Sequence, residues 1–237
     1  MLHLSLLHLD KSDLRWRTLS PYQAHQLVWK AFPAAEKRSF LYHLQEHADH
    51  HGLLVQSRQP PDWSSLPDVD MGLKVIDPAR VAAGDTFSFA LRANPTVQRE
   101  GYADGKRRRV AVSANVDLRK KRAEARGLDI PEVTFDRETT LLHWLARKGD
   151  RGGFELVGLL EGPNRYCHAG PTVSYKIYRG APEERRGQHS ERPITIHGCD
   201  FTGRLRVTNA DAFARTRAIG LGRGKAFGYG LLMVTPI

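Results

Sequence analysis

Five of the eleven residues from Gly220 to Gly230 are glycines, and this run does most to narrow the folds open to the chain. It lacks the Gly-Lys-Ser/Thr ending of a Walker loop, and Lys225 stands where a dinucleotide-binding fingerprint has its third glycine. Both of those loops leave a strand and open a helix, whereas this run follows a helical pattern and precedes a strand pattern. The sequence therefore argues against a nucleotide cofactor.

The glycine-rich run predicts instead a loop of exposed backbone N–H groups that can cradle a phosphate backbone. A helix C-cap followed by a tight turn is the plainer interpretation, but it accounts for only two or three of the glycines. We expect the phosphate contacts to come from Gly222, Arg223, Gly224 and Lys225.

The charge balance points to a polyanionic partner. Thirty-six Lys and Arg residues against 26 Asp and Glu residues leave a formal net charge of +10. A globular protein this basic usually handles nucleic acid, and a merely basic surface is the alternative.

Other compositional features exclude several classes of protein. No apolar stretch approaches the roughly 18 residues of a membrane-spanning helix, so no membrane partner is expected. Cys167 and Cys199 lie 32 positions apart without a second pair, so a disulfide framework is not expected. The cytoplasm is then the default compartment.

The first half of the chain shows the strand and helix patterns of a ferredoxin-like unit. Apolar residues alternate over 2–9, and Ser20, Pro21 and Gln23 form the start of a capped helix that ends before Pro33. Strand patterns follow at 39–45, 53–58 and 86–93, with a short helix expected before the last of them.

The second half repeats this order. It shows strand patterns at 107–113, 154–161 and 229–234, helices at 138–148 and 211–219, and a long hairpin formed by 173–179 and 194–201. A strongly basic insertion occupies 115–130. We therefore predict an α+β fold of two tandem ferredoxin-like (RRM-like) domains, at residues 1–98 and 106–237.

The helix that opens at Ser20 carries a candidate catalytic pair. Tyr22, His25 and Trp29 fall on one side of it, away from its apolar stripe. A histidine titrates near neutrality and can move a proton in phosphodiester chemistry. A structural or solvated histidine is the plainer interpretation of such a residue.

Histidines also suggest a rival site. His47, His50 and His51 lie in the segment His-Ala-Asp-His-His, which could ligate a metal ion. The segment has the pattern of a turn, lacks an acidic or cysteine partner at ligand spacing, and matches no zinc pattern. We expect neither a metal ion nor another cofactor.

Further basic residues are candidate nucleic-acid contacts, although a charged run is more often a solvated surface. They are Lys176, Arg179, Arg185 and Arg186 in the long hairpin, Lys106, Arg107 and Arg108 in the preceding basic strand, and the residues 119–122 of the insertion.

Three motifs together resemble the CasE-type CRISPR-associated endoribonucleases of the RAMP superfamily. They are Gly-Leu-Gly-Arg-Gly-Lys-Ala-Phe-Gly-Tyr-Gly at the C-terminal end, Leu-Arg-Ala-Asn-Pro at 91–95, and Ser-Pro-Tyr-Gln-Ala-His at 20–25. The resemblance spans essentially the whole chain, but the 115–130 insertion and the 180–192 hairpin tip do not match closely.

The resemblance implies a metal-independent endoribonuclease that cuts CRISPR repeat RNA at the 3′ base of its hairpin. Attack by a ribose 2′-OH would leave a 2′,3′-cyclic phosphate and a 5′-OH. His25 would act as general base or general acid, and Tyr22 would position or stabilise the attacking group. The long hairpin would grip the RNA stem, and the protein would retain the mature crRNA with other subunits of the type I-E Cascade complex.

Two other functions compete with this one. A non-catalytic RNA-binding scaffold would use the same loop and hairpin without needing His25. A metal-dependent hydrolase would lose its activity in a chelator.

Overall fold

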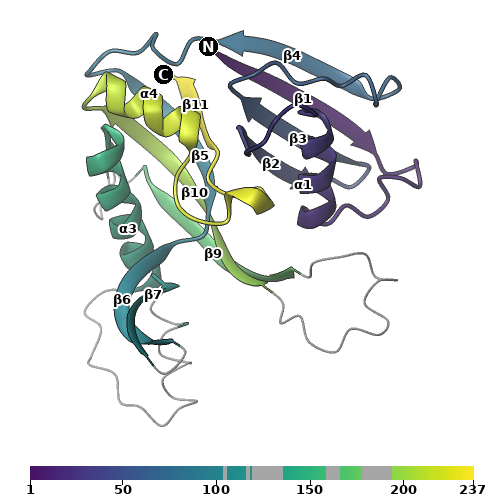
Figure 1. The fold of residues 1–237 in the computed structure, drawn as a ribbon. Coiled ribbons are helices and arrows are strands. Elements are labelled where there is room, and N and C mark those ends of the chain that lie inside the picture. Colours follow the sequence, from purple (N-terminus) through teal and green to yellow (C-terminus); the bar gives the residue numbers. More distant parts are fainter. Residues whose placement is uncertain (104–105, 116–117, 119–135, 159–165, 178–193) are drawn as a thin grey trace.

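The computed structural model spans residues 1–237 and describes all of them except 104–105, 116–117, 119–135, 159–165 and 178–193. For 98–103 and 106–112 it describes the backbone alone. The described chain forms two antiparallel sheets that lie beside each other, each with helical cover, together with a separate two-stranded hairpin (Figure 1).

The first sheet has the strand order β2-β3-β1-β4, which is the order of a ferredoxin-like unit. Its core side chains come from the sheet and from one face of the helix, among them Leu7, Val28 and Leu53. The elements are β1 (Leu2–Asp10), α1 (Pro21–Lys30), β2 (Phe40–Glu46), β3 (His50–Ser57) and β4 (Asp70–Ile76).

The second sheet repeats the same arrangement in the order β11-β5-β10-β8, and β9 pairs with the other part of the long strand β10. Two helices connect and cover it, and the core includes Trp144, Phe154 and Phe201. The elements are β5 (Thr86–Ala93), α3 (Arg137–Gly152), β8 (Phe154–Val157), β9 (His168–Ile177), β10 (Ile194–Val207), α4 (Ala210–Ile219), the 3-10 helix η1 (Lys225–Phe227) and β11 (Leu232–Pro236).

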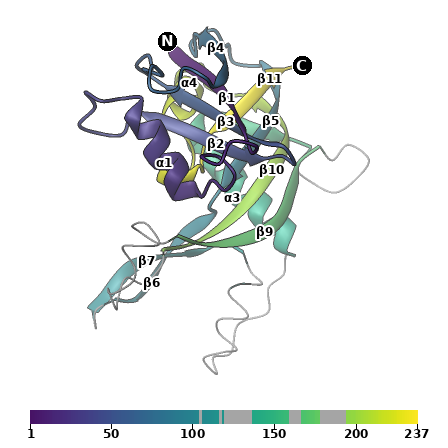
Figure 2. The ribbon, with the colours of Figure 1, turned by 90° about the vertical axis from the view of Figure 1, so that its right-hand side faces the viewer.

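The remaining strands, β6 (Thr96–Ala103) and β7 (Lys106–Ser113), form an antiparallel hairpin that belongs to neither sheet. The hairpin projects from the body of the protein in both ribbon views (Figures 1 and 2).

The predicted α+β class with two ferredoxin-like units is confirmed. One assignment within it is wrong. The strand expected to complete the first unit, 86–93, has the predicted limits but pairs with β10 and β11 in the second sheet. The strand that completes the first sheet is β4, which the sequence analysis missed. The proposed division into domains at 1–98 and 106–237 stays a prediction, but β5 is the first strand of the second unit.

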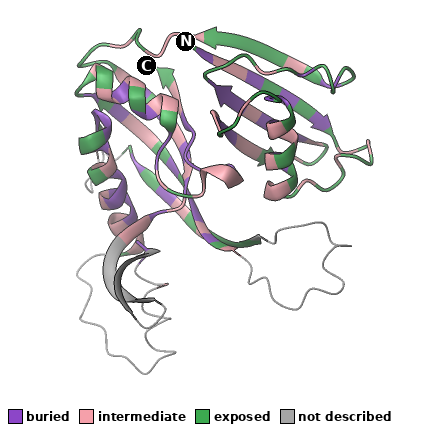
Figure 3. Cartoon of the chain, viewed as in Figure 1, coloured by how far each residue is buried: buried purple, intermediate pink, exposed green. Residues whose placement is uncertain are grey.

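A second difference concerns the segment between β3 and β5. A short helix was expected there, but residues 58–85 contain only turns, irregular chain and β4. β4 lies at the edge of the sheet and its side chains are mostly exposed (Figure 3). Met71, Leu73 and Val75 alternate with less apolar residues, so β4 has the period of a half-buried strand although neither of its faces is buried.

Contacts between the two units are made by polar side chains and by the glycine-rich loop. Gln56 on β3 donates a 2.7 Å hydrogen bond to the carbonyl oxygen of Arg217 on α4. Arg92 on β5 donates a 3.0 Å hydrogen bond to the carbonyl oxygen of Leu44 on β2. In the part of the chain that the structure describes, no helix has the length and apolar character needed to cross a membrane.

Candidate active site

His25 lies on α1 among aromatic rings. The helix begins with the predicted capping box, in which Ser20 accepts a hydrogen bond from the Gln23 backbone and the Gln23 side chain accepts one from the Ser20 backbone. The ring of His25 is partly buried, and its centroid lies 5.8–6.5 Å from those of four neighbouring side chains: Trp29, Phe40, Tyr42 and Phe227.

The surroundings of His25 favour its neutral form. Burial lowers the pKa of the imidazole, and the positive charge of Arg38 lowers it further. Nδ1 is buried without a hydrogen-bond partner, so Nε2 is the ring nitrogen left to reach a substrate. A neutral histidine at pH 7 can accept a proton.

Tyr22, the other predicted catalytic residue, lies one turn earlier on α1. Its side chain is partly buried and packs against the cluster formed by Ile196 on β10 and Tyr229. The aromatic neighbours of His25 lie elsewhere: Trp29 on α1 itself, two rings on β2 and one on η1. The catalytic role of Tyr22 stays a prediction.

Tyr42 on β2 is a site residue that the sequence analysis missed. Its buried hydroxyl lies 2.8 Å from the carbonyl oxygen of Pro21, in the first turn of α1, and 3.0 Å from that of Ala226 in η1. Burial raises the pKa of this phenol, so the hydroxyl keeps its proton and donates it. Tyr42 thereby ties α1 to the glycine-rich loop.

The glycine-rich loop is confirmed as a connection from α4 to β11, and all five glycines have positive φ. Two features exclude a side chain at Gly230. Its φ is +89°, and a Cβ would lie 2.4 Å from the carbonyl oxygen of Leu221. The expected row of free N–H groups is only partly present. The N–H groups of Leu221, Phe227 and Gly230 donate to carbonyl oxygens of the protein itself.

The two cations of the loop differ in their surroundings. Arg223 is exposed. Lys225 is partly buried, and its Nζ donates a 2.7 Å hydrogen bond to the carbonyl oxygen of Ile219. Burial lowers the pKa of Lys225, and the charges of Arg38 and Lys148 lower it further. Arg38 therefore lies near both His25 and Lys225, although no sequence motif marks it.

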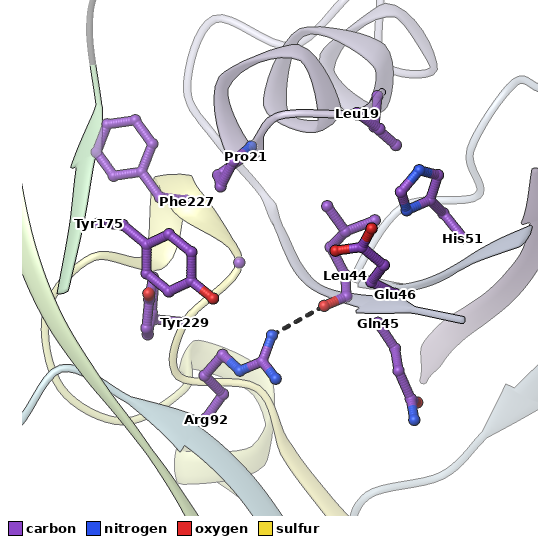
Figure 4. A pocket seen from close by; sticks show the side chains of 11 residues that line it. Leu19, Pro21, Leu44, Gln45, Glu46, His51, Arg92, Tyr175, Phe227 and Tyr229 are labelled. Carbon is purple, nitrogen blue, oxygen red and sulfur yellow. Dashed lines mark hydrogen bonds between the residues drawn. The ribbon is translucent and has the colours of Figure 1, made fainter. Parts of the chain in front are cut away.

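A cavity of about 360 Å³ opens beside this site, between the two sheets (Figure 4). Its walls include Phe227 and Tyr229 from the loop, Tyr175 from β9, and Arg92. Arg92 forms a two-pronged ion pair with Asp200, with distances of 2.7 and 3.0 Å. The Leu-Arg-Ala-Asn-Pro motif thus contributes the residue that joins β5, β10 and β2.

The rival histidine site does not assemble a ligand set. The rings of His47 and His50 stack with centroids 4.3 Å apart, and Nδ1 of His50 lies 2.8 Å from the Asp49 carboxylate. His51 is buried on β3. Among the residues that the structure describes, no three His, Cys, Asp or Glu side chains gather as metal ligands.

The predicted basic contacts are only partly described. Lys176 is exposed on β9, and β9 and β10 form the predicted hairpin. Arg179, Arg185 and Arg186 lie outside the described residues, as do residues 119–122. Lys106, Arg107 and Arg108 begin β7, where the backbone alone is described. Their roles stay predictions.

Comparison with known proteins identifies the family. A family model described as "CRISPR associated protein" matches residues 2–236. The chain belongs to this CRISPR-associated protein family. The family assignment predicted from the three sequence motifs is confirmed.

Named relatives place the protein more narrowly within the CRISPR-associated family. It is 29% identical over 231 residues to the CRISPR-associated endoribonuclease Cse3 of Thermus thermophilus, covering 92% of this chain and 90% of the relative. It is 26% identical over 221 residues to the Cascade subunit CasE of Escherichia coli, covering 91% of this chain and 92% of that relative. A solved structure of Cse3 bound to a 19-nucleotide RNA superposes with a TM-score of 0.72 at 27% identity, covering 99% of this chain and 100% of that one.

Proposed function

We propose that this CRISPR-associated protein is a metal-independent endoribonuclease that cuts CRISPR repeat RNA at the 3′ base of its hairpin. The observation that carries the proposal is His25, a partly buried histidine whose pKa is lowered by burial and by Arg38. His25 lies beside the glycine-rich loop, which adds Lys225 as a second cation next to Arg38. Relatives over nine tenths of the chain are named as an endoribonuclease and a Cascade subunit.

In the proposed reaction His25 acts as the general base. Its neutral imidazole takes the proton of a ribose 2′-OH, and the 2′-oxygen attacks the adjacent phosphorus. The bond from phosphorus to the 5′-oxygen breaks, which leaves a 2′,3′-cyclic phosphate and, after the 5′-oxygen takes a proton from solvent, a 5′-OH. The imidazolium returns its proton to solvent. A base of this kind contributes about 10²–10⁴-fold to the rate.

Arg38 and Lys225 are proposed to stabilise the charge that develops on the phosphate oxygens. Both side chains are partly buried, and a cation acts more strongly on a developing charge where water is partly excluded. Tyr22 is proposed to position the attacking ribose from the first turn of the same helix.

The protein is further proposed to keep the cleaved crRNA and to assemble with other Cascade subunits. The support is the likeness to CasE, which is named as a Cascade subunit, and the net charge of +10. Tight retention of a polyanionic product makes an enzyme effectively single-turnover.

Single-turnover cleavage of a cognate repeat RNA in EDTA tests the proposal. We expect the wild-type protein to cut and His25→Ala to lose about 10²-fold or more in rate while still binding RNA. The exposed neighbour Gln26 provides the control, since Gln26→Ala should cut normally. Analysis of the fragment ends should find the cyclic phosphate.

Other outcomes of this experiment are equally informative. Wild-type binding without cutting would favour an RNA-binding scaffold. Cutting by the wild type that stops in EDTA and returns with divalent metal would favour the metal-dependent reaction. Normal cutting by His25→Ala would remove this residue from the mechanism.

A further inference from the structure

A second group of cations lies on α3, away from the aromatic surroundings of His25. Arg147, Lys148 and Arg151 share one side of this helix, and Arg223 of the glycine-rich loop lies beside them. The four side chains line a hollow of about 750 Å³ that also contacts Trp144. We call these four residues the α3 surface.

The α3 surface carries positive charge without a matching negative charge. Arg147, Arg151 and Arg223 are exposed, and none of the four cations forms an ion pair with a carboxylate in the part of the chain that the structure describes. Lys148 lies over the ring of Trp144, 5.8 Å from its centroid. Among the described residues that line the hollow, Asp150 is the acidic one. Like charges this close repel one another, so the arrangement is stabilised when a polyanion binds.

The α3 surface is continuous with the candidate active site. Lys148 and Arg38 both act on the charge of Lys225, and Arg38 also acts on His25. Cations therefore run from Arg38, just before β2, across the glycine-rich loop to α3. Figure 1 shows this loop, in yellow, between α1 and α3.

The shape and chemistry of the α3 surface suit a phosphodiester backbone. Arginine presents a planar fork of donors that matches phosphate oxygens. Gly222, on the edge of the hollow, has a φ of +74°, a backbone conformation that favours glycine, and the loop here packs closely over Trp144. Trp144 itself is buried, which leaves the contacts to charge rather than to base stacking.

We propose that the α3 surface binds the single-stranded RNA that continues from the cleavage site beyond the hairpin. This inference rests on the proposed function. The stem is assigned to the β9–β10 hairpin, whose described end points away from α3 in Figure 1. An RNA that occupies the active site has a strand on either side of the scissile phosphate, and the row of cations provides a path for the strand that is not in the stem.

The test compares three RNAs: the repeat hairpin alone, the hairpin with a 5′ single-stranded extension, and the hairpin with a 3′ extension. We expect the 3′ extension, which continues from the cleavage site, to strengthen binding to the wild-type protein more than the 5′ extension does, and Arg147→Ala/Arg151→Ala to lose that gain. Hairpin affinity and the cleavage rate at saturation should stay within about twofold. Since each contact with a single-stranded phosphate contributes about 0.7 to the salt slope of log K, the double variant should lower that slope by about 1.4 for the extended RNA.

Two further variants separate site-specific binding from net charge. Arg80→Ala/Arg215→Ala removes two exposed arginines that lie outside the α3 surface and should leave the gain intact. Arg147→Lys/Arg151→Lys keeps the positive charge and should retain most of the gain in affinity that the extension provides.

The inference is overturned if the 3′-extended RNA binds the double alanine variant as tightly as the wild type, or if the 3′ extension does not strengthen wild-type binding. The inference would also be overturned if the double alanine variant lost as much affinity for the hairpin alone as for the extended RNA, since the stem would then lie on this surface. These results differ from failure of the proposed function, in which the wild-type protein does not cut the 3′-extended hairpin at all.

Discussion

At the scale of single residues, the chemistry depends on contacts that sequence spacing does not reveal. His25 was predicted from its motif, and the helix start at Ser20 and Gln23 was predicted from the capping box. Arg38 and Tyr42 were missed because a lone arginine before a strand and a tyrosine within one carry no pattern. Their importance comes from distant partners, since the Tyr42 hydroxyl contacts an oxygen 184 positions away.

Arg38 provides a test of the proton transfer. Arg38→Ala removes a positive charge that opposes protonation of His25, so the pKa of His25 should rise toward its ordinary value. A general base works only when neutral, and the acidic limb of the single-turnover rate against pH should therefore move to higher pH. The plateau rate should also fall by about 10²-fold, as a phosphate-stabilising cation is lost.

The exposed neighbour Lys37 provides the control for this pH profile, because Lys37→Ala removes a charge that does not act on His25. An acidic limb that stays in place, or moves to lower pH, in Arg38→Ala would contradict the assignment of His25 as base.

At the scale of elements, patterns located strands well but did not say which sheet each one joins. The limits of β5 were predicted as 86–93, and they match the structure. Its alternation shows one buried face, but two sheets of the same kind offer equivalent places for it. Pairing with β10 and β11 depends on contacts over more than a hundred residues, which local periodicity does not encode. The alternation of Met71, Leu73 and Val75 in the edge strand β4 was overlooked, because a short helix was expected in this segment.

Tyr42 tests the connection between α1 and the glycine-rich loop. Tyr42→Phe leaves the carbonyl oxygens of Pro21 and Ala226 without this donor, so the free energy of unfolding should fall by about 1–2 kcal/mol. The cleavage rate should fall more than the affinity for RNA, since α1, which carries His25, and the glycine-rich loop lose their common anchor. Urea denaturation and single-turnover cleavage measure the two effects.

A suitable comparison for this variant is Tyr166→Phe, because Tyr166 is on the surface and packs under Arg204 through its ring rather than its hydroxyl. Equal stability of Tyr42→Phe and the wild type would show that the hydroxyl does not hold the two elements together.

At the scale of the whole molecule, Arg92 links the two sheets next to the cavity of Figure 4. Its guanidinium contacts both Asp200 oxygens and the Leu44 carbonyl oxygen, three acceptors from two different sheets. Burial and the charge of Arg92 also lower the pKa of the neighbouring His43 to about 4. Arg92 thus joins the sheet under α1 to the sheet that carries the glycine-rich loop, together with the contacts of Gln56 and Tyr42.

Arg92→Lys keeps the positive charge but loses the planar guanidinium, so a lysine replaces at most some of the hydrogen bonds to Asp200 and Leu44. We expect the urea midpoint to fall by an amount equivalent to about 1–3 kcal/mol. Arg206→Lys is the matched control, since Arg206 forms a single exposed ion pair with Glu155 inside the second sheet and should change stability by less than about 1 kcal/mol. A similar loss of stability in Arg92→Lys and Arg206→Lys would show that the hydrogen bonds of Arg92 do not stabilise the contact between the two sheets.

The position of the glycine-rich loop has a consequence for synthesis on the ribosome. Residues 220–230 and β11 are made after every other described element, and β11 is held by pairing with β5. His25 emerges early, but the loop that carries Lys225 and anchors Tyr42 reaches it only when the last strand has left the exit tunnel. The proposed cleavage activity should therefore be absent from a growing chain, because Lys225 is not yet beside His25.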